Sequence, residues 1–391
     1  MIKLLLIAGA RPNFMKLAPL YFELRKYPSI FNPLVVHTGQ HYDYTMSRVF
    51  FDQFGLPQPD FFLEVGSGSH AHQTGNIMIK AEEIMLSEKP DMIIVFGDVN
   101  STMAASLAAS KLCIPVAHVE AGLRAFDRTM PEEVNRVVSD VLAEMLFSSC
   151  DDANLNLIKE GVDVDRIFLV GNIMIDTLKH FLPQAEKSKI LDKLELEDKR
   201  YILVTLHRPS NVDNPENLQK IAEILTAASE RCPVIFPIHP RTRKNLDSNG
   251  KYSAILNNRN IILTDPLGYF DFIKLQKNAL LVMTDSGGVQ EETTFLGVPC
   301  LTLRENTERP VTITDGTNKL VNLDLKKITS QIDYYMSDGL PSKKRPMFWD
   351  GQTAERIVRI LREHFANKAK QEDQAQRLTS TDKIVLKDAV K

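Results

Sequence analysis

The chain has 391 residues, of which 43% are hydrophobic and 25% are charged, and its formal net charge is -3. These values lie close to the averages of globular proteins, so they exclude a chain that is mainly disordered or fibrous. The near-neutral charge also argues against a nucleic-acid partner, because general nucleic-acid binders carry a basic excess. At about 150 residues per domain, the length predicts two or three domains.

The first apolar run, at residues 4–10, predicts a buried strand. It is short, and Arg11, Pro12 and Asn13 follow it at once, so we interpret it as part of the fold and not as a signal peptide. No stretch approaches the ~18 apolar residues of a membrane span, and we expect no membrane partner. The four cysteines show no C-x-x-C spacing, which fits a protein of the reducing cytoplasm.

Further apolar runs predict the other strands. They lie at 33–39, 92–98, 116–120, 144–149, 167–172, 201–207, 234–240, 261–266, 280–286 and 299–305. Continuous apolar runs that end in Gly, Asp, His or Ser are typical of parallel strands buried on both faces. The segments between them have helical spacing, as in Phe14, Leu17, Tyr21 and Leu24, or Leu218, Ile221, Leu225 and Ala228. The sequence therefore predicts an α/β fold with two doubly wound domains.

The polar stretch Gln184–Lys199 is the expected domain boundary. We expect an N-terminal domain over 1–183, a C-terminal domain over 184–352, a last amphipathic helix over 353–367 that returns to the N-terminal domain, and a poorly ordered polar tail over 368–391. Ligands of such sheets bind beyond the carboxyl ends of the strands. Two domains that face each other would place the site in the cleft between them.

The segment Thr284–Glu292 follows an apolar strand and opens a helix. Gly287 and Gly288 let a ligand approach the backbone, Ser286 adds a hydroxyl donor, and free N–H groups at a helix start favour an anion. The acidic pair that follows suits a sugar hydroxyl better than a phosphate. The alternative is an ordinary glycine turn whose acidic residues stabilise the helix start.

Three basic residues could add to an anion site. Arg11 lies in the first strand–helix loop, Lys16 lies in the first turn of the next helix, and Arg309 precedes a proline in the second half. Cations are disfavoured at a helix start, so something anionic is expected to compensate Lys16. Together with a helix start, the three would suit a pyrophosphate. For Arg309 the alternative is a solvated surface arginine.

Carboxylates follow two of the predicted strands. Asp98 ends the run at 92–98, and Glu120 ends the run at 116–120, which makes both candidates for acid–base chemistry in a cleft. Asp98 could instead cap the following helix. Glu132 fits a capping box with Thr129, and Glu133 fits a solvated helix residue or an ion-pair partner.

Imidazole and guanidine groups close two strands of the second half, in His207-Arg208-Pro209 and His239-Pro240-Arg241. A lone histidine at a strand end is often just hydrogen-bonded, but two such clusters at neighbouring strands favour a site. His37, Gln40 and His41 follow the second strand and are expected to line the same cleft. Gly66–Ala71 fits G-x-G-x-x-A, but it lies outside the first strand–helix turn and predicts no dinucleotide site. No spacing supports a zinc site.

Several of these clusters occur together in a familiar order. The chain contains G-A-R-P-x-x-x-K-L-A-P-L, T-G-Q-H, G-D-x-x-S-T, H-V-E-A-G-L-R, P-E-E-x-N-R, D-S-G-G-x-Q-E-E and T-E-R-P. Between Leu4 and about Phe365 it resembles the non-hydrolysing UDP-N-acetylglucosamine 2-epimerases. The resemblance implies two Rossmann-like domains of glycosyltransferase-B type, a cytoplasmic homodimer, and no metal, nicotinamide or other cofactor. It also implies a role in making N-acetylmannosamine donors for surface polysaccharide.

The resemblance assigns roles to particular residues. It places Asp98, Glu120, Glu132 and His207 at catalytic positions. It places the UDP-sugar substrate on Arg11, Lys16, His207, Phe272, Ser286, Gly287, Gly288, Glu292 and Arg309. In some bacterial members a second UDP-sugar binds beside the substrate as an activator, and Gln40, Gln73, His207 and Arg208 match parts of that site.

Two departures from the family pattern lie near the sugar and activator positions. The family writes H-R-x-E-N where this chain has His207-Arg208-Pro209-Ser210-Asn211, so Ser210 replaces the glutamate. The segment at 125–130 is also shorter than the family pattern. The choice of UDP-sugar and the need for an activator therefore stay open. A 2-epimerase of a diacetamido uronic acid sugar nucleotide, a hydrolysing 2-epimerase, and a glycosyltransferase are the alternatives.

Overall fold

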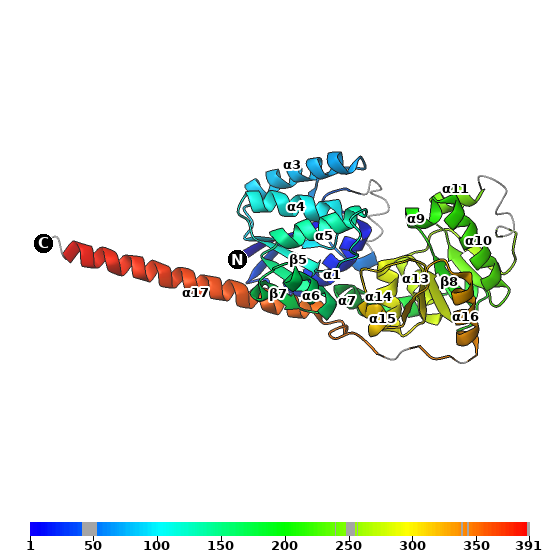
Figure 1. Ribbon diagram of the computed structural model, residues 1–391. Coiled ribbons are helices and arrows are strands. Elements are labelled where there is room, and N and C mark those ends of the chain that lie inside the picture. The colour runs from blue at the N-terminus through cyan, green and yellow to red at the C-terminus, as the bar shows by residue number, and fades with distance from the viewer. Residues whose placement is uncertain are drawn as a thin grey trace.

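Two parallel sheets are the framework of the computed structural model (Figure 1), which describes residues 1–40, 53–238, 240–247, 255, 257–337, 339–341 and 344–388. Within these ranges the first sheet has the strand order β3-β2-β1-β4-β5-β6-β7, and the second has the order β10-β9-β8-β11-β12-β13. The strands of the first sheet are β1 (Ile2–Ala8), β2 (Phe31–His37), β3 (Phe61–Phe62), β4 (Met92–Phe96), β5 (Val116–Ala121), β6 (Met145–Ser148) and β7 (Ile167–Leu169). Those of the second are β8 (Ile202–Thr205), β9 (Val234–Pro237), β10 (Ile261–Thr264), β11 (Leu281–Thr284), β12 (Cys300–Thr302) and β13 (Asn318–Leu320).

Helices connect successive strands of both sheets. In the first half they are α1 (Arg11–Arg25), α3 (His70–Glu88), α4 (Asn100–Lys111), α5 (Pro131–Leu142), α6 (Asp151–Lys159), the 3-10 helix η1 (Val164–Arg166), α7 (Ile173–Glu186) and α8 (Ile190–Lys193). In the second half they are α9 (Pro209–Val212), α10 (Pro215–Ser229), α11 (Pro240–Asp247), α13 (Tyr269–Asn278), α14 (Gly287–Leu296), α15 (Val311–Thr314), α16 (Leu325–Met336) and α17 (Thr353–Asp388).

The apolar composition of the strands follows from their burial on both faces. In β1, Leu4 and Leu6 belong to one buried cluster, whereas Leu5 and Ile7 belong to another on the opposite face. Alternate residues of a strand point to opposite faces, so a strand between two helix layers needs apolar residues throughout. This arrangement confirms the predicted α/β fold of two doubly wound, Rossmann-like sheets of glycosyltransferase-B type.

All eleven predicted runs overlap a strand of the structure, but two strands within the described residues have no predicted run. β3 has two residues that are not fully buried, and β13 has three residues at the edge of its sheet. Such short edge strands bury too little apolar surface to produce a run in the sequence. The predicted boundary segment Gln184–Lys199 lies between the last residues of α7 and the start of β8 and contains α8.

The last helix packs on the first half of the chain. Ile357, Val358 and Leu361 of α17 are buried in the cluster that also contains Leu24 of α1 and Leu178 of α7. We expected a poorly ordered tail from residue 368, but α17 continues to Asp388 and projects away from the two sheets (Figure 1). The segment contains no glycine or proline and is rich in strong helix formers, so nothing in it ends the helix.

The strand order positions a cleft between the two halves. It reverses between β1 and β4 in the first sheet and between β8 and β11 in the second. Ligands of open α/β sheets bind at such reversal points, beyond the carboxyl ends of the strands. α7 packs against α13 and α14, which holds the two halves together beside this region (Figure 1).

Candidate active site

A cavity of about 610 Å³ lies between the two halves at the reversal points of both sheets. Its lining includes eleven of the residues predicted from the sequence, namely Lys16, Asp98, Glu132, His207, Arg208, Phe272, Ser286, Gly287, Gly288, Glu292 and Arg309. Hollows of about 690 and 810 Å³ elsewhere on the molecule contain none of them. The structure thus brings most of the predicted site residues into one cleft.

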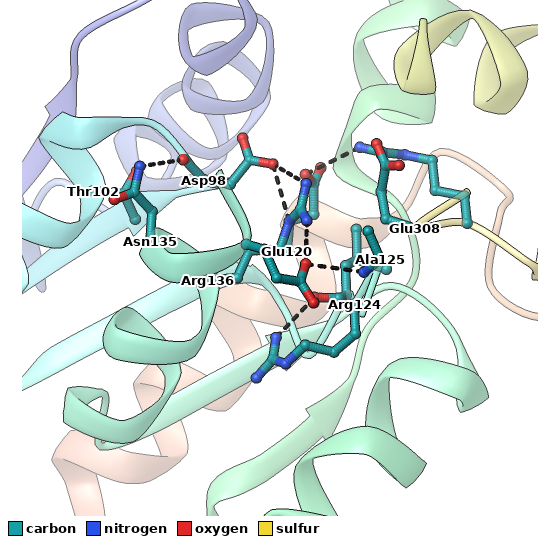
Figure 2. A network of polar contacts seen from close by, with 12 residues as sticks. Asp98, Thr102, Glu120, Arg124, Ala125, Asn135, Arg136 and Glu308 are labelled. Atoms are coloured by element: carbon teal, nitrogen blue, oxygen red, sulfur yellow. Dashed lines mark hydrogen bonds and ion pairs between the residues drawn. The ribbon is translucent and has the colours of Figure 1, made fainter. Parts of the chain in front are cut away.

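Asp98 follows β4 and faces Arg136 of α5 (Figure 2). Arg136 donates to Asp98 Oδ2 from Nη2 at 2.5 Å and from Nε at 3.1 Å. Burial alone would raise the pKa of Asp98, but the charges of Arg136, Lys16 and Arg309 outweigh burial and lower it. The alternative of a helix cap is wrong, because Val99 is the N-cap of α4 and no side chain caps that helix.

Glu132 and Glu133 lie side by side in the sequence but in different environments. Glu132 is exposed and lines the cavity, whereas Glu133 is buried. The predicted capping box does not form, since Met130 is the N-cap of α5 and accepts no side-chain cap bond. Glu133 is an ion-pair partner and not a solvated residue, because Arg136 Nη1 lies 2.6 Å from its Oε2. The backbone N–H groups of Ala125 and Phe126 also donate to it.

Glu120 lies behind the cavity wall at an irregular point of β5. The pairing register with β6 shifts between Val119 and Ala121, and Glu120 has a φ of 75°. A bulge of this kind redirects a side chain, and a left-handed glutamate is costly unless the surroundings impose it. Glu120 Oε1 accepts from Lys16 Nζ at 2.7 Å and from Arg309 Nη2 at 3.4 Å. The bulge thus directs the carboxylate toward the cations of both halves.

Arg309 is buried and is not the solvated arginine that we considered as an alternative. Besides Glu120, its guanidinium pairs with Glu291 Oε1 and with Glu308 Oε1, each at 2.6 Å. A Cβ at position 287 would clash with Arg309 Nη1, so the close approach of the arginine to the start of α14 requires a glycine there. The structure places this cation against the helix start that was predicted to bind an anion.

The buried carboxylate of Asp285 contacts the ring of His207. Asp285 Oδ1 lies 3.0 Å from His207 Nδ1, and Asp285 also accepts from the backbone N–H groups of His207 and Arg208. Burial alone would raise the pKa of Asp285, but its hydrogen bond with His207 and the other donors lower it. The imidazole is 53% exposed and lines the cavity, so Asp285 fixes its orientation while the ring stays accessible.

The start of α14 faces the cavity with Ser286 as its N-cap. No side chain caps this helix, and the first N–H groups of a helix have no partner within it. Phe272 of α13 and the buried Glu292 line the same wall, and Tyr269 Oη lies 3.4 Å from Glu292 Oε1. This wall combines an aromatic ring, a carboxylate and free backbone donors, which suits a nucleotide with its phosphates.

The predicted activator residues are divided between two places. Gln40 Oε1 accepts from Ser101, and Gln73 Nε2 donates to the carbonyl oxygen of Gln40 at 3.1 Å. Gln73 Oε1 then accepts from Asn100, beside Asp98, but neither glutamine lines the cavity. Arg208 lines it and pairs with Glu308 at 3.4 Å.

Other predicted residues lie elsewhere or outside the described part. His37 does not line the cleft, because its ring packs between the rings of Phe14 and Phe62. The centroid of its ring lies 4.7 Å from each of their centroids. The N–H of Gly39 donates to its Nδ1. The side chain of Arg11 lies outside the described atoms, although its backbone begins α1. His41, His239 and the side chain of Arg241 also lie outside the description.

Arg136, Asp285 and Glu308 contribute ion pairs and hydrogen bonds to the site, but sequence reasoning assigned them no role. Glu291, which the sequence suggested as part of an acidic pair for a sugar hydroxyl, instead forms an ion pair with Arg309. Asp285 directly follows β11, so the strand-end reasoning that selected Asp98 could have selected it. Arg136 lies in the P-E-E-x-N-R pattern, three residues after Glu133. Within the described ranges, no group of three His, Cys, Asp or Glu side chains has the arrangement of a metal site, and no helix is long and apolar enough to span a membrane.

Comparisons with known proteins agree with this geometry. A model of the UDP-N-acetylglucosamine 2-epimerase family matches residues 23–362. A Methanococcus maripaludis protein named as a UDP-N-acetylglucosamine 2-epimerase homolog is 47% identical over 362 residues, which are 92% of this chain and 99% of that protein. A UDP-2,3-diacetamido-2,3-dideoxy-D-glucuronate 2-epimerase of Pseudomonas aeruginosa is 38% identical, with the same shares covered.

A solved structure leads to the same family. The Methanocaldococcus jannaschii UDP-GlcNAc 2-epimerase, crystallised in complex with UDP-GlcNAc and UDP, is 42% identical and gives a TM-score of 0.84. The match covers 93% of this chain and 100% of that one. The family model, the relatives and the shared structure together show that this chain belongs to the UDP-N-acetylglucosamine 2-epimerase family.

Proposed function

We propose that the protein is a non-hydrolysing UDP-N-acetylglucosamine 2-epimerase that interconverts UDP-GlcNAc and UDP-ManNAc. The proposal depends on one observation: a single cleft holds acidic side chains from one half opposite an arginine and a helix N-terminus from the other. Asp98 and Glu132 come from the first half, whereas Arg309 and the Ser286–Gly288 helix start come from the second. The proposal includes the cytoplasmic homodimer and the role in surface polysaccharide that the family resemblance implies.

Epimerisation at C2 needs an indirect route. The hydrogen on C2 of an N-acetyl amino sugar is not adjacent to a carbonyl, so its direct abstraction is difficult. If the bond between C1 and the UDP oxygen breaks first, an oxocarbenium-like centre forms beside C2 and acidifies that hydrogen. UDP then leaves with the bonding electrons, a base removes the C2 proton, and a 2-acetamidoglucal remains. Re-addition of UDP, with a proton delivered to the opposite face of C2, completes the reaction.

The second half is suited to the departing diphosphate. Arg309, the amides that begin α14, and His207 line the same part of the cavity, and Lys16 faces them from α1. Donors aimed at developing charge are each worth roughly 3 kcal/mol in the transition state. His207 is oriented by Asp285 at its Nδ1, so its remaining ring nitrogen can meet the nucleotide.

The first half is suited to proton transfer. Asp98, Glu120 and Glu132 occupy three different environments: beside Arg136, beside Lys16, and exposed on the cavity wall. The two faces of C2 need separate proton relays, so more than one carboxyl group is expected to take part. Burial raises the pKa of Asp98, but the charges of Arg136 and the other cations lower it by more. Asp98 therefore stays ionised at neutral pH and can accept a proton.

Proton exchange with solvent tests the reaction. The enzyme is incubated with UDP-N-acetylglucosamine in heavy water and followed by NMR. We expect the manno epimer and deuterium at C2 of both sugars. Substrate that stays unlabelled after long incubation would overturn the proposal. Release of free N-acetylmannosamine with UDP would instead identify a hydrolysing enzyme.

A second substrate has support of its own. The Pseudomonas aeruginosa relative is named for a diacetamido uronic acid sugar nucleotide, and Ser210 of this chain replaces a glutamate of the family pattern. A panel that adds this UDP-sugar to the NMR assay separates the two, since the preferred substrate takes up deuterium faster. The same panel tests the proposed activator site. One UDP-sugar is held at saturating concentration as substrate while a second is added. If the second acts as an activator, deuterium exchange on the first should become faster.

A further inference from the structure

Three carboxylates share the guanidinium of Arg309, but they differ in what else compensates their charge. Glu308 also pairs with Arg304 Nη2 at 2.8 Å and with Arg208 Nη2 at 3.4 Å. Glu120 also pairs with Lys16 at 2.7 Å. Within the described part of the chain, Glu291 has an ion pair with Arg309 alone. Glu291 is therefore the carboxylate that depends most on this one cation.

Glu291 is also incompletely hydrogen-bonded. Its Oε1 accepts from Arg309 Nε, whereas its Oε2 is buried and has no donor among the described residues. The residue is 1% exposed, yet it contributes to the cavity wall. A buried charged oxygen without a donor is costly, and a protonated carboxyl would instead offer an O–H that needs an acceptor. A ligand with oxygen acceptors would supply one.

The surroundings of Glu291 determine how it responds to added negative charge. The charged and titratable groups that face it from the elements packed around α14 are Arg309, Glu308, Glu120, Lys16 and Cys150. Burial raises the pKa of Glu291 to about 7, the positive charge of Arg309 opposes this effect, and the nearby charge of Glu120 adds to it. If Arg309 compensated the charge of Glu291 less well, the protonation of Glu291 would therefore change near neutral pH.

We propose that Glu291 takes up a proton from solvent when the diphosphate of a nucleotide sugar binds at Arg309. The two negative charges of the diphosphate compete with Glu291 for the guanidinium, and a buried carboxylate beside Glu120 loses part of the compensation that Arg309 supplies. Protonation removes that repulsion, and the O–H at Oε2 gains ligand oxygens as acceptors. No covalent bond of the sugar changes in this step. The inference rests on the proposed function, because it requires a nucleotide diphosphate in this cavity.

Calorimetry measures this proton directly. The probe is UDP-N-acetylglucosamine that the enzyme has already brought to equilibrium, so that no net epimerisation contributes heat. Its diphosphate is a diester without an ionisation near pH 7. Titrations in PIPES, HEPES, imidazole and Tris give the number of protons taken up, from the slope of the observed enthalpy against the ionisation enthalpy of the buffer.

We expect net uptake of up to one proton per site that is larger at pH 8.0 than at pH 7.0, as linkage predicts for a group that binds the proton more tightly in the complex than in the free enzyme. The Kd should rise by up to about tenfold per pH unit above pH 7 for the same reason. The Glu291→Gln variant should bind the ligand without proton uptake and with a nearly flat Kd. The matched control is Glu292→Gln, a buried neighbour on the same helix, which should keep the proton count even where binding weakens.

The outcomes separate this inference from the proposed function. Binding by the wild type without proton uptake, or with uptake that Glu291→Gln leaves unchanged, overturns the inference and leaves the epimerase proposal standing. Absence of any binding of the UDP-sugar overturns the epimerase proposal instead. If Glu291→Gln does not fold, the wild-type Kd still decides, because a Kd that stays flat between pH 7 and pH 8 contradicts proton-linked binding.

Discussion

Glu120 and Arg309 form an ion pair across the cleft, with 3.4 Å between Glu120 Oε1 and Arg309 Nη2. Glu120 lies in β5 of the first sheet, whereas Arg309 follows β12 of the second, and both are buried. Lys16 reaches the same carboxylate oxygen at 2.7 Å. One carboxylate of the proton-transfer side is thus coupled to two cations of the proposed diphosphate side.

Replacing Glu120 by glutamine should separate chemistry from binding. The amide keeps the shape but cannot exchange a proton, so kcat should fall roughly 10²- to 10⁴-fold. UDP binding should be kept or strengthened, because Lys16 and Arg309 lose a competing anion. Deuterium incorporation at C2 measures the first effect, and calorimetry with UDP measures the second. Glu144→Gln is the control, because Glu144 is exposed and remote from the cavity. Exchange at the wild-type rate in Glu120→Gln would contradict this role.

Arg309→Lys should weaken UDP binding. The planar guanidinium of arginine can contact three carboxylates and a ligand at once, whereas the compact ammonium group of lysine cannot. Hydrogen bonds to charged groups are worth about 1.5–3 kcal/mol, so the Kd for UDP should rise roughly 10- to 100-fold. Arg304→Lys is the matched control, because Arg304 pairs with Glu308 in the same loop but does not line the cavity. An equal loss in both variants would show that the loop, and not Arg309, determines the affinity.

Asp285→Asn should disturb both His207 and the acid stability of the protein. The carboxylate accepts from two backbone N–H groups and from Asn211, and an amide can satisfy these donors only in part. The pKa of Asp285 is lowered in the fold, so its stabilisation is complete above the unfolded value of about 3.9 and is lost as the pH falls through the folded value. The free energy of unfolding in urea should therefore drop by about 1–3 kcal/mol at pH 7.

The difference between Asp285→Asn and the wild type should shrink below about pH 4, because Asp285 takes up a proton there in the unfolded chain while its folded pKa stays lower. A parallel loss of kcat at unchanged UDP affinity would show that the orientation of His207 matters for the reaction. A destabilisation that stayed constant down to pH 3 would contradict the charged state assigned to Asp285.

Burial and strand order explain which features could be predicted from the sequence. The strands are buried on both faces, so they produce apolar runs, and polar residues at their carboxyl ends gather at one edge of each sheet. This reasoning located Asp98, Glu120 and His207 from the chain alone. The position of His37 was predicted wrongly, because the aromatic rings that enclose it come from α1 and β3 and are distant in the sequence.

Partnerships between side chains were beyond sequence reasoning. Whether Arg309 is solvated or buried depends on three glutamates from β5, α14 and the preceding loop position, and no local pattern specifies their approach. The start of α17 is a second case, because the N–H groups of Thr353 and Ala354 donate to a side chain of a different helix. That side chain is Asp176 of α7, and no local pattern in the sequence links it to residue 353.

Asp176→Asn should change how the stability of the protein depends on pH. Asp176 accepts from the N–H groups of Thr353 and Ala354 at 3.1 and 2.8 Å, and burial raises its pKa to about 6. The folded protein therefore holds an additional proton between about pH 4 and pH 6. The contribution of Asp176 to the free energy of unfolding must therefore fall as the pH rises through this range. At about 1.4 kcal/mol per pKa unit, the fall amounts to roughly 3 kcal/mol.

An asparagine at position 176 can still accept a hydrogen bond at the start of α17, but it cannot titrate. Relative to Asp176→Asn, the wild type should thus lose roughly 3 kcal/mol between pH 4 and pH 7, as measured by urea unfolding at each pH. Asp151→Asn is the control, because this exposed residue begins α6 and should leave the pH profile unchanged. If wild type and Asp176→Asn gave parallel profiles, Asp176 would be ionised throughout the range, and the N–H donors of α17 would outweigh its burial.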